Sequence, residues 1–385
     1  MNVPAAEQVP AHRARVFAMA LLLVVTFLGF LNYSALLAVV PLWASEGGAG
    51  SAAVGGATAV MMAATVLTQC FAPVLFRLAS LRLLMVLGAM LLGPIALVYT
   101  VSDALWVILS VTAVRGVGFA LMVIAGATLA ADLAPQGRVA ASVSLYGAAA
   151  ALPNLVALAG GVWAAGTWGF GVVFSIAAGA GLLAALLSLL LPGHLRGRAS
   201  LSSLSGQRAM LGPLTCLALV AAAFGATTTF LPLSGPAVSQ TSWALFVASA
   251  AMVAGRLVAG ALGARLAAGR ILTMSVLVVA AGLVITAQAL EGPLAILLLG
   301  AALTGAGFGA CQNDSFVTLV HRLGPAHTAT ASTVWNMVYD GSIGAGAFLL
   351  GWVIGAAGYG GAFVIAGLST AGFALLRAWL SAPQR

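Results

Sequence analysis

The feature that most constrains the fold is a series of twelve long apolar runs that fills almost the whole chain of 385 residues. A helix that crosses a bilayer needs about 20 predominantly apolar residues. Breaking the chain at glycine, proline and charged positions places the runs at 16–44, 53–76, 83–101, 105–131, 139–163, 168–191, 212–234, 243–264, 271–290, 294–320, 329–355 and 361–380. The sequence therefore predicts an all-α membrane protein with twelve transmembrane helices.

Composition supports this fold class and excludes others. The chain is 62% hydrophobic and only 6% charged, which is too few charges to cover a surface in water, whereas lipid solvates apolar side chains directly. The net charge is +8, but all fifteen basic residues are arginines scattered singly or in pairs, so no continuous basic patch indicates nucleic-acid binding. Cys70, Cys216 and Cys311 lie within apolar runs without metal-ligand spacing, and we expect them to be buried free thiols.

The arginines also predict the orientation in the membrane. Thirteen of them fall in the two termini and in every second connection, while the other connections carry only Glu46, Asp103 and Glu291. The positive-inside rule then places both termini in the cytoplasm, as an even number of spans requires. The polar segment 192–211 is predicted to be a cytoplasmic linker between two six-helix bundles, 1–191 and 212–385.

The two predicted bundles resemble each other at an offset of about 188–191 residues. "RLASLRLL" in the first half matches "RLAAGRIL" in the second, and "GVGFALM" matches "GAGFGAC" in the fourth span of each half. The first match sets two arginines five positions apart in each half: Arg77 and Arg82, then Arg265 and Arg270. Parallel six-helix repeats build transporters whose site lies between the halves near the membrane midplane.

On these segments the chain resembles the major facilitator superfamily over essentially its whole length. "VRGVGFALM" is similar to the span-four signature, which carries an intramembrane arginine, here Arg115. "LYGAAAALPNLVALAGG" weakly resembles the span-five signature of antiporters, and "VYDGSIGAG" resembles a span-eleven segment of bacterial drug- and metabolite-efflux members. The resemblance implies a proton-driven exporter.

The chain departs from the family pattern in the loop between spans two and three of each half. The two arginine pairs resemble the family's loop signature, but its acidic residue is replaced by Phe76 in the first half and Ala264 in the second. The gating salt bridge that this acid usually makes is therefore not implied. The loop arginines and Arg256, near the same face of the membrane, remain candidates for a gate.

Four charged residues fall within predicted spans: Arg115, Arg256, Asp314 and Asp340. Charges in hydrocarbon normally pair with one another or face water, and they often mark a transport pathway. For Asp340 two hypotheses stand. It is a proton carrier, because partial desolvation favours the protonated form of a carboxyl group, or it is a structural acid bound to a nearby arginine, hydroxyl or backbone group.

The other three intramembrane charges also have two interpretations each. Asp314 is a second candidate for contact with protons or substrate, or it forms an ion pair with Arg256 or Arg322. Arg115 modulates the charge of the cavity, as the resemblance implies, or it binds backbone carbonyls at a helix contact. Arg256 is expected to serve a gate or helix packing near the cytoplasmic face.

Neutral polar and aromatic residues within the predicted spans form a second set of candidates, for lining a cavity. Trp335 and Tyr339 are four positions apart and therefore share a helix face. Such a set suits an amphipathic organic molecule, although each residue alone is also consistent with packing. The set comprises Asn32, Tyr33, Tyr146, Asn154, Gln312, Asn313, Trp335, Asn336 and Tyr339.

The sequence contains no Walker motif and no cluster of metal ligands, so we expect no enzyme activity, no cofactor and no bound metal. The prediction is a monomeric secondary transporter in a bacterial inner membrane, working in a lipid bilayer by alternating access. It would export a small organic compound, a drug or a metabolite, in exchange for protons. The alternative is a proton-coupled or passive uptake transporter for a sugar, an organic acid or another small metabolite.

Overall fold

A computed structural model describes residues 5–135, 137–197, 207–235, 237–263, 265–324 and 327–380, and helices dominate the described chain. The first group of helices is α1 (Ala5–Glu46), α2 (Ser51–Cys70), α3 (Ala72–Leu78), α4 (Leu81–Leu92), the 3-10 helix η1 (Pro94–Thr100), α5 (Leu105–Asp132), α6 (Val139–Trp168) and α7 (Phe170–Ser188). The second group is α8 (Gln207–Phe230), η2 (Leu231–Leu233), α9 (Val238–Gly263), α10 (Leu272–Gln288), α11 (Leu294–Leu323) and α12 (Thr328–Leu380). Much of the predicted linker, 198–206, and Ala264 lie outside the described residues.

The predicted all-α membrane fold is confirmed. Within the described ranges, ten helices are long and apolar enough to cross a membrane, and α10 is a shorter apolar helix. The long α12 contains two crossings, because Gly358 interrupts it with φ 67° and ψ 176°, a conformation that favours glycine. Helices suit this environment because lipid offers no partners to backbone N–H and C=O groups.

The third predicted crossing, 83–101, is not one continuous α-helix as the sequence suggested. It consists of α4 and η1, and the break comes at Gly93 and Pro94. Proline lacks an N–H, and its ring crowds the carbonyl four residues earlier, here that of Met90. The amide of Ala96 bonds to the carbonyl of Gly93 at 2.8 Å. The carbonyl of Leu92, the usual acceptor for Ala96 in an α-helix, is left for another donor.

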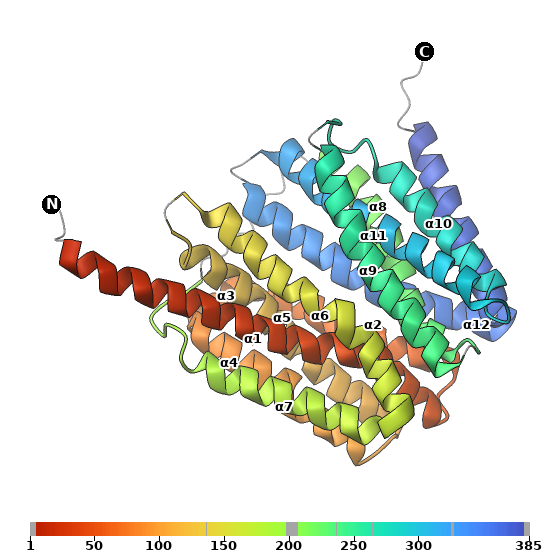
Figure 1. The fold of residues 1–385 in the computed structure, drawn as a ribbon, viewed down its shortest axis with the longest axis horizontal. Coiled ribbons are helices and arrows are strands. Elements are labelled where there is room, and N and C mark those ends of the chain that lie inside the picture. Colours follow the sequence, from red (N-terminus) through yellow and green to blue (C-terminus); the bar gives the residue numbers. More distant parts are fainter. Residues whose placement is uncertain are drawn as a thin grey trace.

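The helices of the two groups lie on either side of the bundle, and both ends of the chain emerge on the same side (Figure 1). We call this side the arginine-rich end, because its loops and helix ends carry Arg77, Arg82, Arg265, Arg270 and Arg322. The groups meet mainly through α2 with α12 and α6 with α9, and also through α1 and α2 with α8.

Close contacts join the two groups at the end opposite the arginine-rich end. Ser51 donates from Oγ to the carbonyl of Gly351 at 2.7 Å, and the hydroxyls of Thr58 and Thr229 bond at 3.1 Å. Gly166 of α6 approaches α9 so closely there that a Cβ would clash with a valine. From this contact α6 and α9 diverge toward the arginine-rich end (Figure 1). The halves are therefore closed together at one end and spread at the other.

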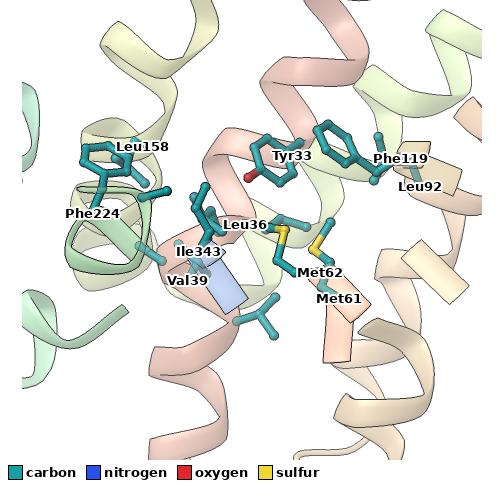
Figure 2. Packing of buried hydrophobic residues seen from close by; sticks show 14 of the residues in the cluster. Tyr33, Leu36, Val39, Met61, Met62, Leu92, Phe119, Leu158, Phe224 and Ile343 are labelled. Atoms are coloured by element: carbon teal, nitrogen blue, oxygen red, sulfur yellow. The ribbon is translucent and has the colours of Figure 1, made fainter. Parts of the chain in front are cut away.

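Apolar side chains fill the middle of the bundle where the groups meet. Figure 2 shows Leu36 of α1 and Met62 of α2 among the packed side chains, together with Phe224 of α8 and Ile343 of α12. All four are buried. Burial of this kind between helices depends on close packing, because lipid tails are as apolar as the side chains themselves.

The cysteines follow the prediction only in part. Cys216 and Cys311 are buried free thiols, but Cys70 is exposed on the protein surface at the end of α2. The expectation of burial was wrong for Cys70, because an apolar run shows that a segment enters lipid and not which face of its helix packs against protein.

Candidate transport site

Asp340 lies between the two groups of helices. It is only 4% exposed, and its Oδ2 accepts a hydrogen bond of 2.8 Å from Nε2 of Gln69. Gln69 is in the last turn of α2 and is 3% exposed. The carboxyl group of Asp340 is therefore held by a neutral amide from the opposite half of the protein, and not by the arginine, hydroxyl or backbone partners that the sequence suggested.

Gln69 is a site residue that sequence reasoning missed. The two residues are 271 positions apart, so no local pattern connects them. A signal does exist, because Gln69 is the only amide side chain in α2, whose sequence is "SAAVGGATAVMMAATVLTQC". An isolated amide in a membrane span needs a partner, as an isolated carboxylate does.

A column of aromatic rings stands beside Asp340. Trp335 stacks on Tyr339 with ring centroids 5.3 Å apart, and Tyr339 stacks on Phe308 at 5.9 Å. Phe308 stacks on Phe224 at 4.3 Å, so the column joins α12, α11 and α8. The shared face that the sequence predicted for Trp335 and Tyr339 is confirmed. Both of these rings are half-buried, which leaves part of each available to a ligand.

Amide groups flank this column. Gln312 of α11 is 4% exposed and lies beside the hydroxyl of Tyr339. Its Oε1 has no hydrogen-bond partner in the described chain. Asn313 is half-buried, and Asn336 donates to the carbonyl of Ser332 at 2.8 Å. Of these candidates of the second half, Gln312, Trp335 and Tyr339 are joined by contacts beside Asp340, and Asn336 lies one turn before it on α12.

Arg115 is 1% exposed and binds groups of its own half. Its Nη2 donates to Oδ1 of Asn32 at 3.0 Å, and its Nε donates to the carbonyl of Leu92 at 3.2 Å. The guanidinium also lies 5.8 Å from the ring centroid of Tyr99. Arg115 therefore satisfies the carbonyl that the break between α4 and η1 leaves free, which agrees with the backbone-binding alternative.

Asn32 extends this network and does not face an open cavity. Its Nδ2 donates to the carbonyl of Ala177 at 2.7 Å, so Arg115 and Asn32 together link α1, α4, α5 and α7. Arg115 also lines a small pocket between α1, α2 and α5, with Thr58 and Thr112 in its wall. Arg115 therefore makes structural hydrogen bonds and also lies in the wall of a small pocket.

Asp314 binds the backbone of a loop. Its two carboxylate oxygens accept hydrogen bonds from the amides of Gly269 at 3.0 Å and Ile271 at 3.3 Å. Ile271 is the N-cap position of α10, where helix amides lack internal partners. These partners are not the arginines that the sequence suggested. This carboxylate stabilises the start of a helix.

The candidates from the first half are more dispersed. Tyr33 stacks on Phe119 at 4.1 Å, as Figure 2 shows, and lies within electrostatic range of Tyr339 and Asp340. In contrast, the hydroxyl of Tyr146 donates to a carbonyl of α5 at 3.4 Å. Asn154 accepts a hydrogen bond of 2.7 Å from a serine of α1. Among these first-half candidates in the described part of the chain, Tyr33 is the one within electrostatic range of Asp340.

The five gate candidates, Arg77, Arg82, Arg256, Arg265 and Arg270, are all exposed. Arg256 lies on α9 within electrostatic range of Tyr339. In the first half, Phe76 occupies the position of the family's acid, is buried, and packs its ring against Gly197. The carbonyl of Arg77 accepts a hydrogen bond of 3.3 Å from Arg196. The chain after α7 thus packs against this loop through an aromatic ring and a backbone bond.

No protein-family model and no curated protein matches the sequence. Solved structures are similar in fold. A POT family transporter in complex with 5-aminolevulinic acid is 12% identical, with a TM-score of 0.78 over 94% of this chain and 96% of that one. A bacterial homolog of the human lysosomal transporter Spinster, inward-facing and unoccupied, is 13% identical, with a TM-score of 0.76 over 95% and 96%.

The nucleoside transporter NupG is 14% identical, with a TM-score of 0.71 over 94% of this chain and 98% of that one. Identities this low show the fold alone. The similarity extends over nearly the full length of both chains in each comparison, and it covers both groups of helices. The chain therefore has the fold of major facilitator transporters.

Proposed function

We propose that this protein is a secondary transporter that exports a small organic compound in exchange for protons, and that Asp340 binds the proton. The observation that carries the proposal is the place of Asp340, a buried carboxyl group on the boundary between two halves that diverge toward one end. In alternating access the two halves rock around a central site. A proton on Asp340 would change its hydrogen bond to Gln69, and the rocking motion must alter this contact because it joins the two halves.

The aromatic column and a half-buried amide near Asp340 support an organic substrate. Trp335 and Tyr339 offer apolar ring surface, and Asn336, half-buried one turn before Asp340, offers a hydrogen-bonding group. Sites for small molecules typically combine apolar walls with a few polar groups. The solved structures of similar fold include transporters crystallised with 5-aminolevulinic acid and with a peptide conjugate.

The arginine-rich end would face the cytoplasm, because arginines in short loops favour that side. The described conformation would then be open toward the cytoplasm. The resemblance of "VYDGSIGAG" to efflux members supports export as the direction of transport. Asp314 is the weaker candidate for the proton, since both of its oxygens already bind backbone amides.

The test is proton movement coupled to substrate. Purified protein would be reconstituted in liposomes that contain a pH-sensitive dye, and a panel of amino acids, short peptides, nucleosides and amphipathic drugs would be added outside. An exchanger that takes a compound in must release protons from the lumen, so we expect the lumen to become alkaline. A lumen that turns acidic would indicate symport, and compound uptake without a pH change would indicate uniport; either result contradicts the proposal.

A further inference from the structure

The side chain of Gln69 has one more hydrogen-bonding group than its contact with Asp340 uses. Its Nε2 donates to Oδ2 of Asp340 at 2.8 Å, but its Oε1 is buried and accepts no hydrogen bond in the described chain. A buried acceptor without a partner costs roughly 1–3 kcal/mol and calls for an explanation. A second state of the site, in which Oε1 accepts a hydrogen bond, would explain it.

Protonation of Asp340 would create such a state. An ionised carboxylate only accepts hydrogen bonds, whereas a protonated carboxyl group carries one O–H donor that needs an acceptor. A half-turn of the Gln69 amide group about its last side-chain bond exchanges Nε2 and Oε1. The same side chain can then donate to the ionised form or accept from the protonated form without movement of α2.

We propose that Gln69 is the positioning residue that sets the proton affinity of Asp340, with Nε2 serving the ionised form and Oε1 the protonated form. This inference rests on the proposed function, because it takes Asp340 as the proton carrier. Gln69 itself carries no proton. The proton enters from water, binds one carboxylate oxygen of Asp340 and leaves from the same group, so no other reactant is required.

The ionisable groups near Asp340 are a separate set from this hydrogen-bond partner. In electrostatic range of its surroundings lie Tyr33 of α1, Tyr339 of α12, Arg115 of α5 and Arg256 of α9. Among the remaining helices packed on α12, α10 contains no charged residue, and the sequence of α8 contains Arg208 and Cys216. The sequence of α11 contains Cys311, Asp314, His321 and Arg322, and Asp314 is bound to backbone amides. Gln69 is the side chain bonded to the carboxyl group.

The experiment titrates Asp340 directly and needs no transported substrate. Infrared spectra of the full-length protein in liposomes would be recorded across pH, following the C=O stretching band of protonated carboxyl groups. The part of this band that disappears in Asp340→Asn belongs to Asp340. Gln69→Met keeps the length but has no amide, so the ionised form loses its donor and the protonated form loses its acceptor. The loss to the ionised form is larger, because hydrogen bonds to a charged group are roughly twice as strong as neutral ones. We expect the midpoint of that band to rise by about one pH unit, a tenfold change in proton affinity.

Thr65→Val is the matched control, because Thr65 is a buried residue one turn earlier in α2 that bonds carbonyls of its own half. We expect it to leave the midpoint unchanged. An unchanged midpoint in Gln69→Met would overturn the role of Gln69. If no band is lost in Asp340→Asn, Asp340 takes up no proton and the proposed function itself is contradicted, so the two failures are distinguishable.

A second pair of variants covers the case in which Gln69→Met does not fold. If Gln69 acts through Asp340, removing both partners should restore folding, since replacing both members of a buried pair with apolar groups is nearly neutral. We therefore expect Gln69→Met combined with Asp340→Leu to fold, and Gln69→Asn, whose amide is too short to reach, to raise the midpoint. A double variant that stays unfolded would show that Gln69 serves packing alone and would overturn the inference.

Discussion

Asp314 accepts a hydrogen bond from the amide of Ile271 at 3.3 Å, and the matching amide in the first half has a different acceptor. At the repeat offset of 188 residues, Ile271 corresponds to Leu83, whose amide bonds to Oγ of Ser80 at 3.3 Å. The second half has Ala268 at the position of Ser80. The carboxylate of Asp314 thus replaces a missing serine cap.

The same substitution explains the other oxygen of Asp314. It binds the amide of Gly269 at 3.0 Å, and the matching amide in the first half, that of Leu81, bonds to the carbonyl of Leu195 at 3.0 Å. One carboxylate therefore serves two amides that the first half satisfies with a serine and with the chain after α7. These two hydrogen bonds explain why α11 contains an acid, and the explanation requires no role in transport.

The first prediction concerns this cap. Asp314→Ala should lower the free energy of unfolding by about 1–3 kcal/mol. The amide of Gly269, in the loop before α10, and that of Ile271, at its N-cap, would both lose their acceptor. Adding Ala268→Ser should recover part of the loss, since it rebuilds the cap of the first half. Thermal unfolding in detergent checks both. Equal stability of the wild-type protein and Asp314→Ala, or loss of proton coupling in a stable variant, would refute the structural role.

The second prediction concerns Arg115. Arg115→Lys keeps the positive charge but cannot make the forked contact with Asn32 and the carbonyl of Leu92, so we expect a loss of about 2 kcal/mol in unfolding free energy. Arg77→Lys is the matched control at an exposed position and should unfold like the wild-type protein. If Arg115→Lys is as stable as the wild-type protein, charge alone matters at this site and the network does not stabilise the break after α4.

The third prediction concerns close packing of α9 against α11. Gly309 lies so near the carbonyl of Met252 that a side chain cannot fit without movement of a helix backbone. Gly309→Val should therefore destabilise the protein by at least about 1–3 kcal/mol and reduce the yield of folded protein. Gly260→Val in α9 is the control, because open space surrounds that glycine. Similar yields for both variants, measured by size-exclusion chromatography, would count against this packing.

The parts of this fold that sequence reasoning predicts are those set by local composition. The length of an apolar run decides whether a helix can span a bilayer. The predicted runs 329–355 and 361–380 leave a gap that contains Gly358, where the structure interrupts α12. The stacking of Trp335 on Tyr339 likewise follows from helical spacing within one segment. Run length has a limit as a predictor, as Pro94 shows. The apolar run 83–101 is long enough for one helix, but the proline within it divides the crossing into α4 and η1.

Contacts between distant segments were not predictable in this way. Asp340 and Gln69 belong to different halves, and only the packing of α2 against α12 brings them together. For Asp314 the sequence suggests contact with protons or substrate, or an ion pair with an arginine, whereas the hydrogen-bond partners in the structure are the amides of Gly269 and Ile271. The repeat held the missing information, since comparison of Ser80 with Ala268 would have shown that the second half lacks a cap.

The most direct test of the central proposal is transport by Asp340→Asn. The substitution keeps a hydrogen-bonding group of the same size beside Gln69 but removes the proton site. Reconstituted with a substrate from the compound panel, the variant should insert, bind and exchange that substrate across the membrane, and it should show no accumulation driven by a pH gradient. A well-folded Asp340→Asn protein that still accumulates substrate against its gradient at the wild-type rate would contradict the assignment of Asp340 as the proton carrier.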